Sequence, residues 1–176
     1  MDFDKIIDDY LKRDKRKKQI GRYYPSDIPY CIRKTYYSFK IGKEIAQDKL
    51  RLFKIGDLVH EFITDVLRRS DLAERVDSEK SLLIADAEED LVISGRLDNF
   101  VTLKDKNETP FVAEVKSIKS LMRWDPTTKS WYEMDSPQPE HVMQLIPYLK
   151  VMNVSRGFIV YVDKVTGKTK WFEVPF

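Results

Sequence analysis

The sequence predicts an α/β fold in which helices flank a central mixed β-sheet. Apolar residues recur at helical spacing before residue 70 and again after residue 139, and β-rich segments lie on either side of that second helical region. The resulting order is helices, three strands, a loop, a helix and two strands, which is typical of a mixed sheet covered by helices. A chain of 176 residues with 42% hydrophobic residues suits a single domain with a sizeable core, spanning residues 1–176.

The N-terminal third is expected to be helical. Residues 2–18 carry one apolar stripe at helical spacing, and a short helix is expected around Ile28 to Phe39 after a turn-rich stretch. A long amphipathic helix is expected from Asp48 to Arg69. The side chains expected to form its buried face are Leu52, Ile55, Val59, Phe62, Ile63, Val66 and Leu67. Residues 1–45 would thus form a helical, basic subregion in front of a core at residues 46–176.

The three central strands are expected between residues 79 and 118. Residues 79–85 and the β-rich stretch from Leu91 to Lys104 predict the first two. Gly95, within the second, indicates a bulge or a close approach of another segment. A turn at residues 104–110 should form a hairpin with a third strand from Phe111 to Ile118.

The last part of the chain combines an aromatic loop, a helix and two strands. Ser120 to Pro139 is rich in proline and aromatic residues and is expected to be a long loop, which in compact domains is usually functional or mobile. A helix from Glu140 to Met152 should bend at Pro147. Strands at residues 156–163 and 169–174 complete the fold.

Composition excludes several classes of protein. No segment approaches the ~18 unbroken apolar residues that a membrane helix needs, and the charged N-terminus lacks the apolar stretch of a secretory signal. The single cysteine, Cys31, can form neither an internal disulfide nor a paired zinc motif. We therefore expect a cytoplasmic protein (in the host cell's cytoplasm if the gene is viral) with no membrane partner.

Charge is unevenly distributed along the chain. Residues 1–60 hold 15 Lys/Arg against 9 Asp/Glu, whereas residues 61–176 hold 16 against 20. The densest basic run, residues 12–18, would suit a polyanionic partner such as nucleic acid. A solvated helix face explains this run equally well. The candidate nucleic-acid contacts of this region are Lys12, Arg13, Arg16, Lys17 and Arg33.

Two predicted strands carry acidic residues among apolar ones. Glu114 and Lys116 share one face because strand side chains alternate, and alone they are explained more simply as an ion pair on an exposed edge strand. Asp98 lies in the neighbouring strand, where the alternative is a strand-end aspartate bonded to backbone amides. Two carboxylates on neighbouring strands repel each other unless a cation lies between them. The pair Asp98 and Glu114 therefore indicates a site for Mg²⁺ or Mn²⁺.

Two helices supply further polar side chains. His60 falls within the apolar stripe of the Asp48–Arg69 helix, where a packed core histidine is the simpler interpretation, although imidazole is a competent ligand for Mn²⁺-class metals. Gln144 and Tyr148 are four residues apart and share a helical face with His141. They could bond a phosphate or a water molecule. The alternative is an ordinary amphipathic helix whose polar residues face solvent.

Taken in order, these residues resemble the PD-(D/E)XK nuclease superfamily in its RecB-like branch. The matching motifs are G-x-x-x-H at Gly56–His60, G-R-L-D at Gly95–Asp98, E-V-K at Glu114–Lys116 and Q-x-x-x-Y at Gln144–Tyr148. Within that branch the chain looks most like the CRISPR-associated Cas-four exonucleases, because residues 26–37 resemble their S-x-x-x-x-C-x-R-x-x-Y-Y segment. The resemblance covers about residues 22–174, and it implies a restriction-endonuclease-like core.

The resemblance implies a metal-binding site. Asp98 and Glu114 would bind Mg²⁺ or Mn²⁺ with assistance from the Val115 carbonyl, and His60 would complete or support the metal shell. Lys116 would position the attacking water or stabilise the phosphorane-like charge.

The resemblance also implies a function and partners. Gln144 and Tyr148 would orient the Lys116 amine and the nucleic-acid strand. The implied activity is that of a metal-dependent DNA nuclease, an exonuclease acting on single-stranded DNA or DNA ends. Protein partners would then belong to a DNA-processing or CRISPR adaptation complex.

One departure from the Cas-four exonucleases concerns cysteine. Those proteins hold an iron–sulfur cluster with four cysteines, one at the position of Cys31 and three near the C-terminus. Here Cys31 is alone, so no four-thiolate cluster can form within this chain. Either the chain is a cluster-free relative or the sequence lacks a C-terminal segment. We favour the first interpretation, because the final strand ends compactly at residues 171–174, and we expect no iron–sulfur cluster.

Two other functions remain open. A non-catalytic DNA-binding or assembly protein would use the basic N-terminal helix and the aromatic side chains of Trp124, Trp131 and Tyr132. A structure-specific endonuclease would share the acidic pair and the lysine. We expect the loop that carries Trp124 and Trp131 to cover the active-site groove and to contact DNA. Packing of these aromatic rings on the protein body is equally consistent with the sequence.

Overall fold

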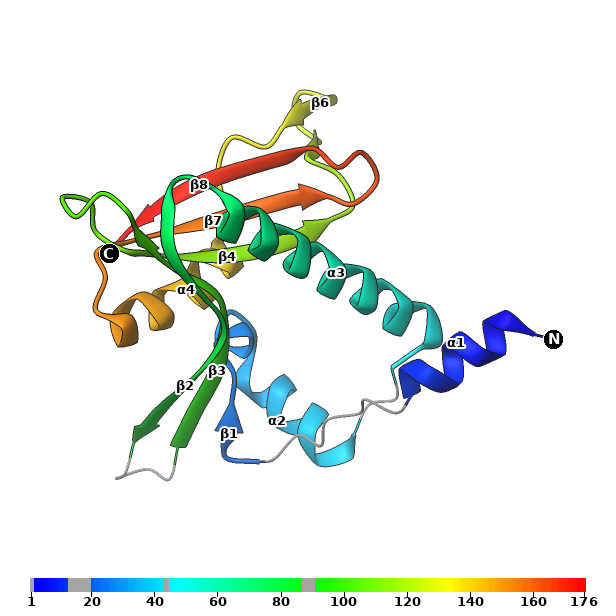
Figure 1. Cartoon of the computed structure of the whole chain (residues 1–176). Helices are drawn as coiled ribbons and strands as arrows, with labels where there is room; N and C mark the ends of the chain where they lie inside the picture. The colour runs from blue at the N-terminus through cyan, green and yellow to red at the C-terminus, as the bar shows by residue number, and fades with distance from the viewer. Residues whose placement is uncertain (1, 13–19, 43–44, 87–90) are drawn as a thin grey trace.

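The computed structural model describes residues 2–12, 20–42, 45–86 and 91–176 (Figure 1). Its helical elements are α1 (Phe3–Lys12), the 3-10 turn η1 (Pro25–Asp27), α2 (Ile32–Ile41), α3 (Gln47–Arg69) and α4 (Pro139–Met152). The predicted helices at 48–69 and 140–152 are confirmed, each beginning one residue earlier than expected. Asn153, in the left-handed conformation, ends α4 by donating its N–H to the carbonyls of Leu149 and Lys150.

The N-terminal helices differ from the sequence-based expectation. The first is confirmed over Phe3–Lys12, and the rest of its predicted span, residues 13–18, lies outside the described residues. The second begins at Ile32 and not at Ile28. Pro25 opens a 3-10 turn, and Pro29 has no N–H to donate to a helix, so the chain turns once more before α2 begins.

The predicted buried face of α3 is confirmed only in part. Ile63 is buried, and Val59 and Leu67 pack beside it against the sheet. The other expected members are 43–58% exposed, namely Leu52, Ile55, Phe62 and Val66. Leu52 and Ile55 belong to the first half of α3, which extends past the sheet (Figure 1), whereas Phe62 and Val66 are exposed although they belong to the half that packs on the sheet.

The central sheet is mixed, as predicted. Its strands are β1 (Arg22–Tyr23), β2 (Ala73–Asp86), β3 (Leu91–Leu103), β4 (Phe111–Ile118), β7 (Arg156–Asp163) and β8 (Thr169–Pro175). They follow the order β1-β3-β4-β7-β8, and β2 also pairs with β3. The β1–β3 and β4–β7 pairs are parallel, and the others are antiparallel. The predicted hairpin between β3 and β4 is therefore confirmed, and β2 is longer than the strand expected at 79–85.

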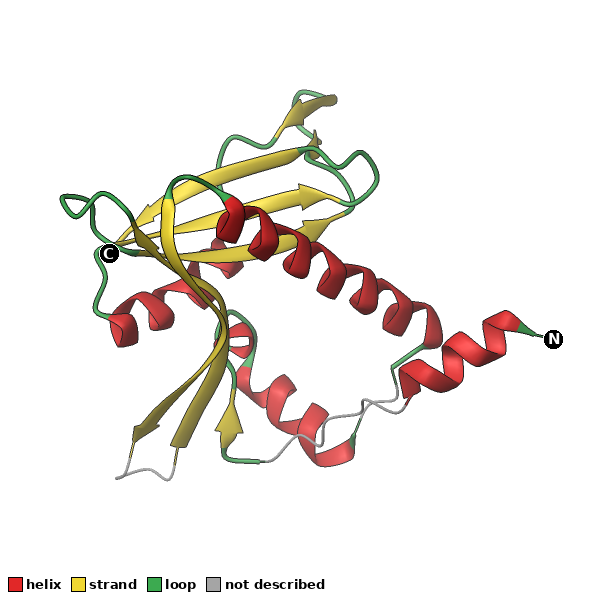
Figure 2. Ribbon diagram, in the orientation of Figure 1, coloured by secondary structure: helices red, strands yellow, loops and turns green. Residues whose placement is uncertain are grey.

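Helices cover both faces of this sheet (Figure 2). The face toward α4 holds the largest buried cluster, which includes Leu97, Val112, Leu145, Tyr148, Leu149, Ile159 and Tyr161. The face toward α3 packs Val115 and Val162 against Ile63. Because side chains alternate along β4, Glu114 and Lys116 point to the α4 side and Val115 to the α3 side.

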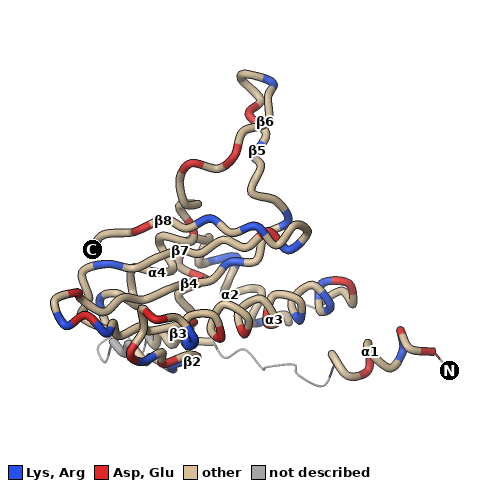
Figure 3. The backbone as a smooth tube through the Cα atoms, turned by 45° about the horizontal axis from the view of Figure 1, so that its top comes forward, with Lys and Arg blue, Asp and Glu red and all other residues tan. Residues whose placement is uncertain are grey.

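The predicted aromatic loop at residues 120–139 contains a hairpin of two short strands, β5 (Met122–Asp125) and β6 (Ser130–Glu133). The expectation of an irregular loop was therefore wrong. Trp124 and Trp131 are cross-strand partners in this hairpin, and aromatic cross-strand pairs stabilise antiparallel strands. Figure 3 shows the hairpin projecting away from the rest of the fold.

No helix among the described residues has the length and apolar character needed to cross a lipid bilayer.

Candidate active site

The candidate site lies where β3 and β4 separate. Their pairing runs from Val101↔Phe111 to Asn99↔Ala113 and ends there, while β1 pairs with β3 only at Val92 and Ile93. Beyond this point the Val115 N–H donates to a side chain instead of a backbone carbonyl of β3. Its acceptor is Asp98 Oδ2, at 2.8 Å. Asp98 is 9% exposed. The sequence offered, as the alternative to a metal ligand, an aspartate bonded to backbone amides. One of the two Asp98 oxygens, Oδ2, makes such a bond.

The second oxygen of Asp98 faces α3. His60 Nδ1 lies 3.2 Å from Asp98 Oδ1. One helical turn earlier, Gly56 lies so close to β4 that a Cβ there would be 3.2 Å from Ser117 Oγ. The glycine of the G-x-x-x-H motif therefore lets α3 approach the strand closely and deliver His60 to Asp98.

On the α4 side, three side chains form a closed set of hydrogen bonds. Lys116 Nζ donates to Glu114 Oε1 at 2.8 Å and to Gln144 Oε1 at 2.9 Å. Gln144 Nε2 donates to the same Glu114 oxygen at 2.6 Å. Glu114 Oε2, in contrast, is buried and has no hydrogen-bond partner among the described residues. A buried carboxylate oxygen without a partner calls for an explanation, and an ion is one of the recognised ones.

Tyr148 lies on the same face of α4 as Gln144, as its spacing predicts, and contacts β3. Its hydroxyl donates to the Arg96 carbonyl at 3.3 Å, and its ring packs on Gly95. A Cβ at Gly95 would lie 2.7 Å from the Tyr148 ring and 2.9 Å from Pro25. Gly95 is therefore a point of close approach, as predicted in one of two alternatives, whereas the ladder irregularity of the β2–β3 pair lies at Ala73 and Arg75.

The electrostatics of the site are dominated by burial and by the two acids. Burial of Glu114 and the nearby charge of Asp98 raise the pKa of Glu114 to about 7, although the Lys116 ammonium opposes this. Burial alone would lower the pKa of His60, but its hydrogen bond to Asp98 and the charges of both acids outweigh burial and raise it. Burial, followed by the Glu114 charge, raises the pKa of Tyr148. The pKa directions therefore reflect the burial of Glu114 and the closeness of Asp98, Glu114, His60 and Lys116 to one another.

The residues fit a hydrated divalent cation better than a closed metal cage. Among the described residues, no three His, Cys, Asp or Glu side chains are arranged to hold a metal ion. Mg²⁺ usually keeps several waters and takes one or two carboxylates from the protein. The unpaired Glu114 Oε2, with Asp98 close enough to raise the Glu114 pKa, offers such carboxylate oxygens.

Other predicted site residues lie apart from this cluster. Lys12 ends α1 and is 3.7 Å from Asp9. Arg33, on α2, lies over the Tyr37 ring at 5.9 Å. Arg13, Arg16 and Lys17 lie outside the described residues.

The two tryptophans are on the projecting hairpin and are 48% and 64% exposed. Trp124 and Trp131 meet edge to face at 5.6 Å. The hairpin that carries them projects away from the rest of the fold (Figure 3), so it does not cover the candidate site as expected. Their expected contact with DNA stays a prediction.

Sequence reasoning missed two residues beside the cluster. Tyr161 on β7 is fully buried and is the register partner of Lys116 on β4. Its hydroxyl lies 2.8 Å from His141 Nδ1. Arg123 on β5 has a buried Nη2 without a hydrogen-bond partner among the described residues. The alternation of β7 could have placed Tyr161, but nothing in the sequence links Arg123 to this place.

Comparison with known proteins informs the fold. No protein-family model and no curated protein sequence matches the chain. Among solved structures, the crystal structure of a protein named SSO0001 superposes with a TM-score of 0.70. The superposition covers 99% of this chain and 78% of that chain, at 20% sequence identity. At this identity the likeness establishes a shared fold.

Proposed function

We propose that this chain is a metal-dependent nuclease that hydrolyses phosphodiester bonds in DNA, built on a restriction-endonuclease-like core of the PD-(D/E)XK type. The observation that carries the proposal is the buried carboxylate of Glu114, which has one oxygen bound to Lys116 and the other without a hydrogen-bond partner in the described part of the chain. Asp98 stands at the adjacent strand separation. An acidic pair that can hold a divalent cation, with a neighbouring amine, suits metal-dependent hydrolysis of a phosphodiester.

The backbone adds one possible metal ligand to these side chains. The N–H and C=O of a strand residue point to the same side, and the Val115 N–H points toward Asp98. The Val115 carbonyl is therefore directed to the side of Asp98 as well, as the family resemblance implies. Mg²⁺ or Mn²⁺ held by Asp98, Glu114 and this carbonyl, with His60 in support, would activate water and neutralise charge on the phosphate.

The remaining residues position the amine and the acid. Gln144 binds both Glu114 and Lys116, so it fixes the direction of the Lys116 ammonium toward the site. His60 holds Asp98 in place through Oδ1 while Val115 holds Oδ2. Lys116 then supplies positive charge where the reacting phosphate gains negative charge. Tyr148 supports the arrangement by packing on Gly95, which keeps α4 against β3.

The substrate is proposed to be single-stranded DNA or a DNA end. The exposed pair Trp124 and Trp131 offers aromatic faces on which unpaired bases can stack. Duplex bases are already stacked on one another, so these rings favour an unpaired strand.

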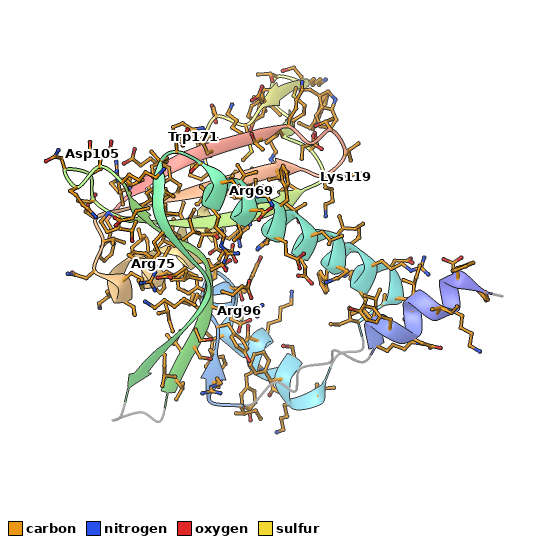
Figure 4. All side chains as sticks on the ribbon, in the orientation of Figure 1. Arg69, Arg75, Arg96, Asp105, Lys119 and Trp171 are labelled. Atoms are coloured by element: carbon orange, nitrogen blue, oxygen red, sulfur yellow. The ribbon has the colours of Figure 1, made fainter. Side chains whose placement is uncertain are left out.

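A nuclease assay tests the proposal. The chain and its Asp98→Ala variant are incubated with Mg²⁺ or Mn²⁺ and labelled single-stranded, double-stranded and closed circular DNA. We expect cleavage of the linear substrates by the wild type and loss of at least 100-fold with Asp98→Ala, in line with the cost of losing one transition-state contact. Asp105→Ala, which removes an exposed acid from the β3–β4 turn (labelled in Figure 4), should retain activity. Equal activity of wild type and Asp98→Ala would refute the assignment, and cutting of the closed circle would identify an endonuclease.

A second candidate function is a DNA-binding protein without catalytic activity. It is favoured by the lack of a three-residue metal cluster among the described side chains and by the exposed tryptophan pair. Binding of single-stranded DNA without cleavage in either metal would select this function.

A further inference from the structure

A second cluster of polar side chains lies beside Lys116, on the same face of the sheet. Tyr161 on β7 is in register with Lys116 on β4, and neighbouring strands lie about 4.8 Å apart. The Tyr161 hydroxyl accepts the Gln138 N–H at 2.9 Å and lies 2.8 Å from His141 Nδ1. His141 is on the first turn of α4, three residues before Gln144, which is about 4.5 Å along the helix axis.

The hydrogen bonds of Tyr161 fix the tautomer of His141. Burial and the nearby Lys116 charge lower the pKa of His141 to about 4, so the ring is neutral at pH 7. The Tyr161 oxygen already accepts from Gln138, and its own proton needs an acceptor, which is His141 Nδ1. The ring proton of neutral His141 is then on Nε2. His141 therefore presents an N–H donor from the atom that Tyr161 does not occupy.

Arg123 brings positive charge to the same place. Its strand, β5, alternates between exposed and half-buried residues, and Arg123 is on the half-buried side, opposite in direction to Trp124. Its guanidinium acts electrostatically on both His141 and Tyr161. Arg123 Nη2 is buried and has no hydrogen-bond partner among the described residues.

The charge balance of this cluster favours an anion. The charged groups that act on His141 are the cations Lys116 and Arg123 and a single carboxylate, Glu140, on the same turn of α4. Lys116 already donates to Glu114 and Gln144, whereas Arg123 Nη2 has no hydrogen-bond partner among the described residues. The free guanidinium N–H of Arg123 and the imidazole N–H of His141 suit the oxygens of a phosphate.

We propose that Arg123 and His141 form a second phosphate subsite beside Lys116, which binds a phosphate of the DNA strand next to the one that is cleaved. This inference rests on the proposed nuclease function. The subsite would fix the register of the strand, so that the scissile phosphate lies at Lys116 and Glu114.

The test measures binding of single-stranded oligonucleotides in EDTA, so that it does not depend on cleavage. Each oligonucleotide carries one neutral methylphosphonate linkage at a different position, and a further pair differs only in a 5′-phosphate or 5′-hydroxyl. The variants are Arg123→Gln and His141→Asn, the latter keeping an acceptor for the Tyr161 hydroxyl. Arg69→Gln is the matched control, since Arg69 (labelled in Figure 4) has an 80% exposed side chain that pairs with Asp65 on the same helix, α3.

We expect one methylphosphonate position to weaken wild-type and Arg69→Gln binding about tenfold, which is the usual worth of a charge-assisted contact. Arg123→Gln and His141→Asn should bind the all-phosphate strand correspondingly less well, with no further loss at that position. An unchanged methylphosphonate penalty in both variants would overturn the subsite while leaving a nuclease that cleaves DNA intact. A penalty found only on removal of the 5′-phosphate, and abolished in the variants, would assign the subsite to strand ends and overturn its place on an internal linkage.

Discussion

The pKa of Glu114 leads to a measurable prediction about Glu114→Gln. In the unfolded chain the carboxyl loses its proton near pH 4.5, whereas burial and the Asp98 charge keep it protonated in the folded protein up to about pH 7. The folded state therefore binds this proton more tightly. Its contribution to stability is fully present below about pH 4.5 and is lost as the pH rises through 7. A difference of this size corresponds to about 3 kcal/mol.

Glutamine mimics the protonated acid and does not titrate. Its Oε1 can accept the bonds from Lys116 and Gln144, and its NH₂ group takes the place of the unpaired Oε2. Any constant cost of the substitution is the same at all pH values. The free energy of unfolding of Glu114→Gln minus that of the wild type should therefore increase by about 3 kcal/mol between pH 4 and pH 8. For a chain of this size this is roughly 6–12 °C in Tm.

The assay is urea and thermal unfolding of both proteins in EDTA at several pH values. Added Mn²⁺ at pH 8 should raise the Tm of the wild type, because a cation replaces the lost proton, and should raise that of Glu114→Gln much less. The variant should also be inactive as a nuclease. A stability difference that stays constant from pH 4 to pH 8 would refute the reasoning, since it would mean that Glu114 ionises as readily in the folded protein as in the unfolded one.

Three further changes test other parts of the structure. Gly95→Ala should destabilise the fold by about 1–3 kcal/mol in urea unfolding, because its Cβ would lie 2.7 Å from the Tyr148 ring; unfolding at the same urea concentration as the wild type would contradict this close approach. Asp98→Asn should lower the pKa of His60 in an NMR titration, since Asp98 is the main group that raises it; an unchanged pKa would contradict the contact. Replacing Trp124 and Trp131 together by alanine should weaken single-stranded DNA binding by about 1–3 kcal/mol per stacked base while leaving the Mn²⁺-induced Tm shift intact.

The grouping of side chains at the candidate site could be predicted from sequence where it depends on short regular spacings. Glu114 and Lys116 are two apart on a strand, and that period alone places them on one face. The period of α4 placed Gln144 and Tyr148 on a common face as well, but it could not show that the two side chains make different contacts. Gln144 binds the acid and the amine, while Tyr148 packs on Gly95 and bonds the Arg96 carbonyl.

The parts that sequence could not provide depend on contacts between distant segments. The apolar stripe of α3 continues past the point where the sheet ends, so periodicity predicted burial for Leu52 and Ile55 that the fold does not supply. Proline and tryptophan suggested an irregular loop at 120–139, whereas the Trp124–Trp131 pair stabilises a hairpin. The position of Arg123 follows from where that hairpin leaves the sheet, which no local pattern encodes.

The two motif glycines allow close packing of helices, and the same helices carry residues of the candidate site. Gly56 lies one helical turn before His60 and lets α3 approach Ser117, which brings the imidazole to Asp98. Gly95 lies three residues before Asp98 and receives the Tyr148 ring, which keeps α4, and with it Gln144, over the strand separation. A Cβ at Gly95 would lie 2.7 Å from the Tyr148 ring, and a Cβ at Gly56 would lie 3.2 Å from Ser117 Oγ, so a side chain at either position would crowd a contact between a helix and the sheet. The glycines are therefore as much a part of the candidate site as the acids, and their substitution should reduce activity even where the fold survives.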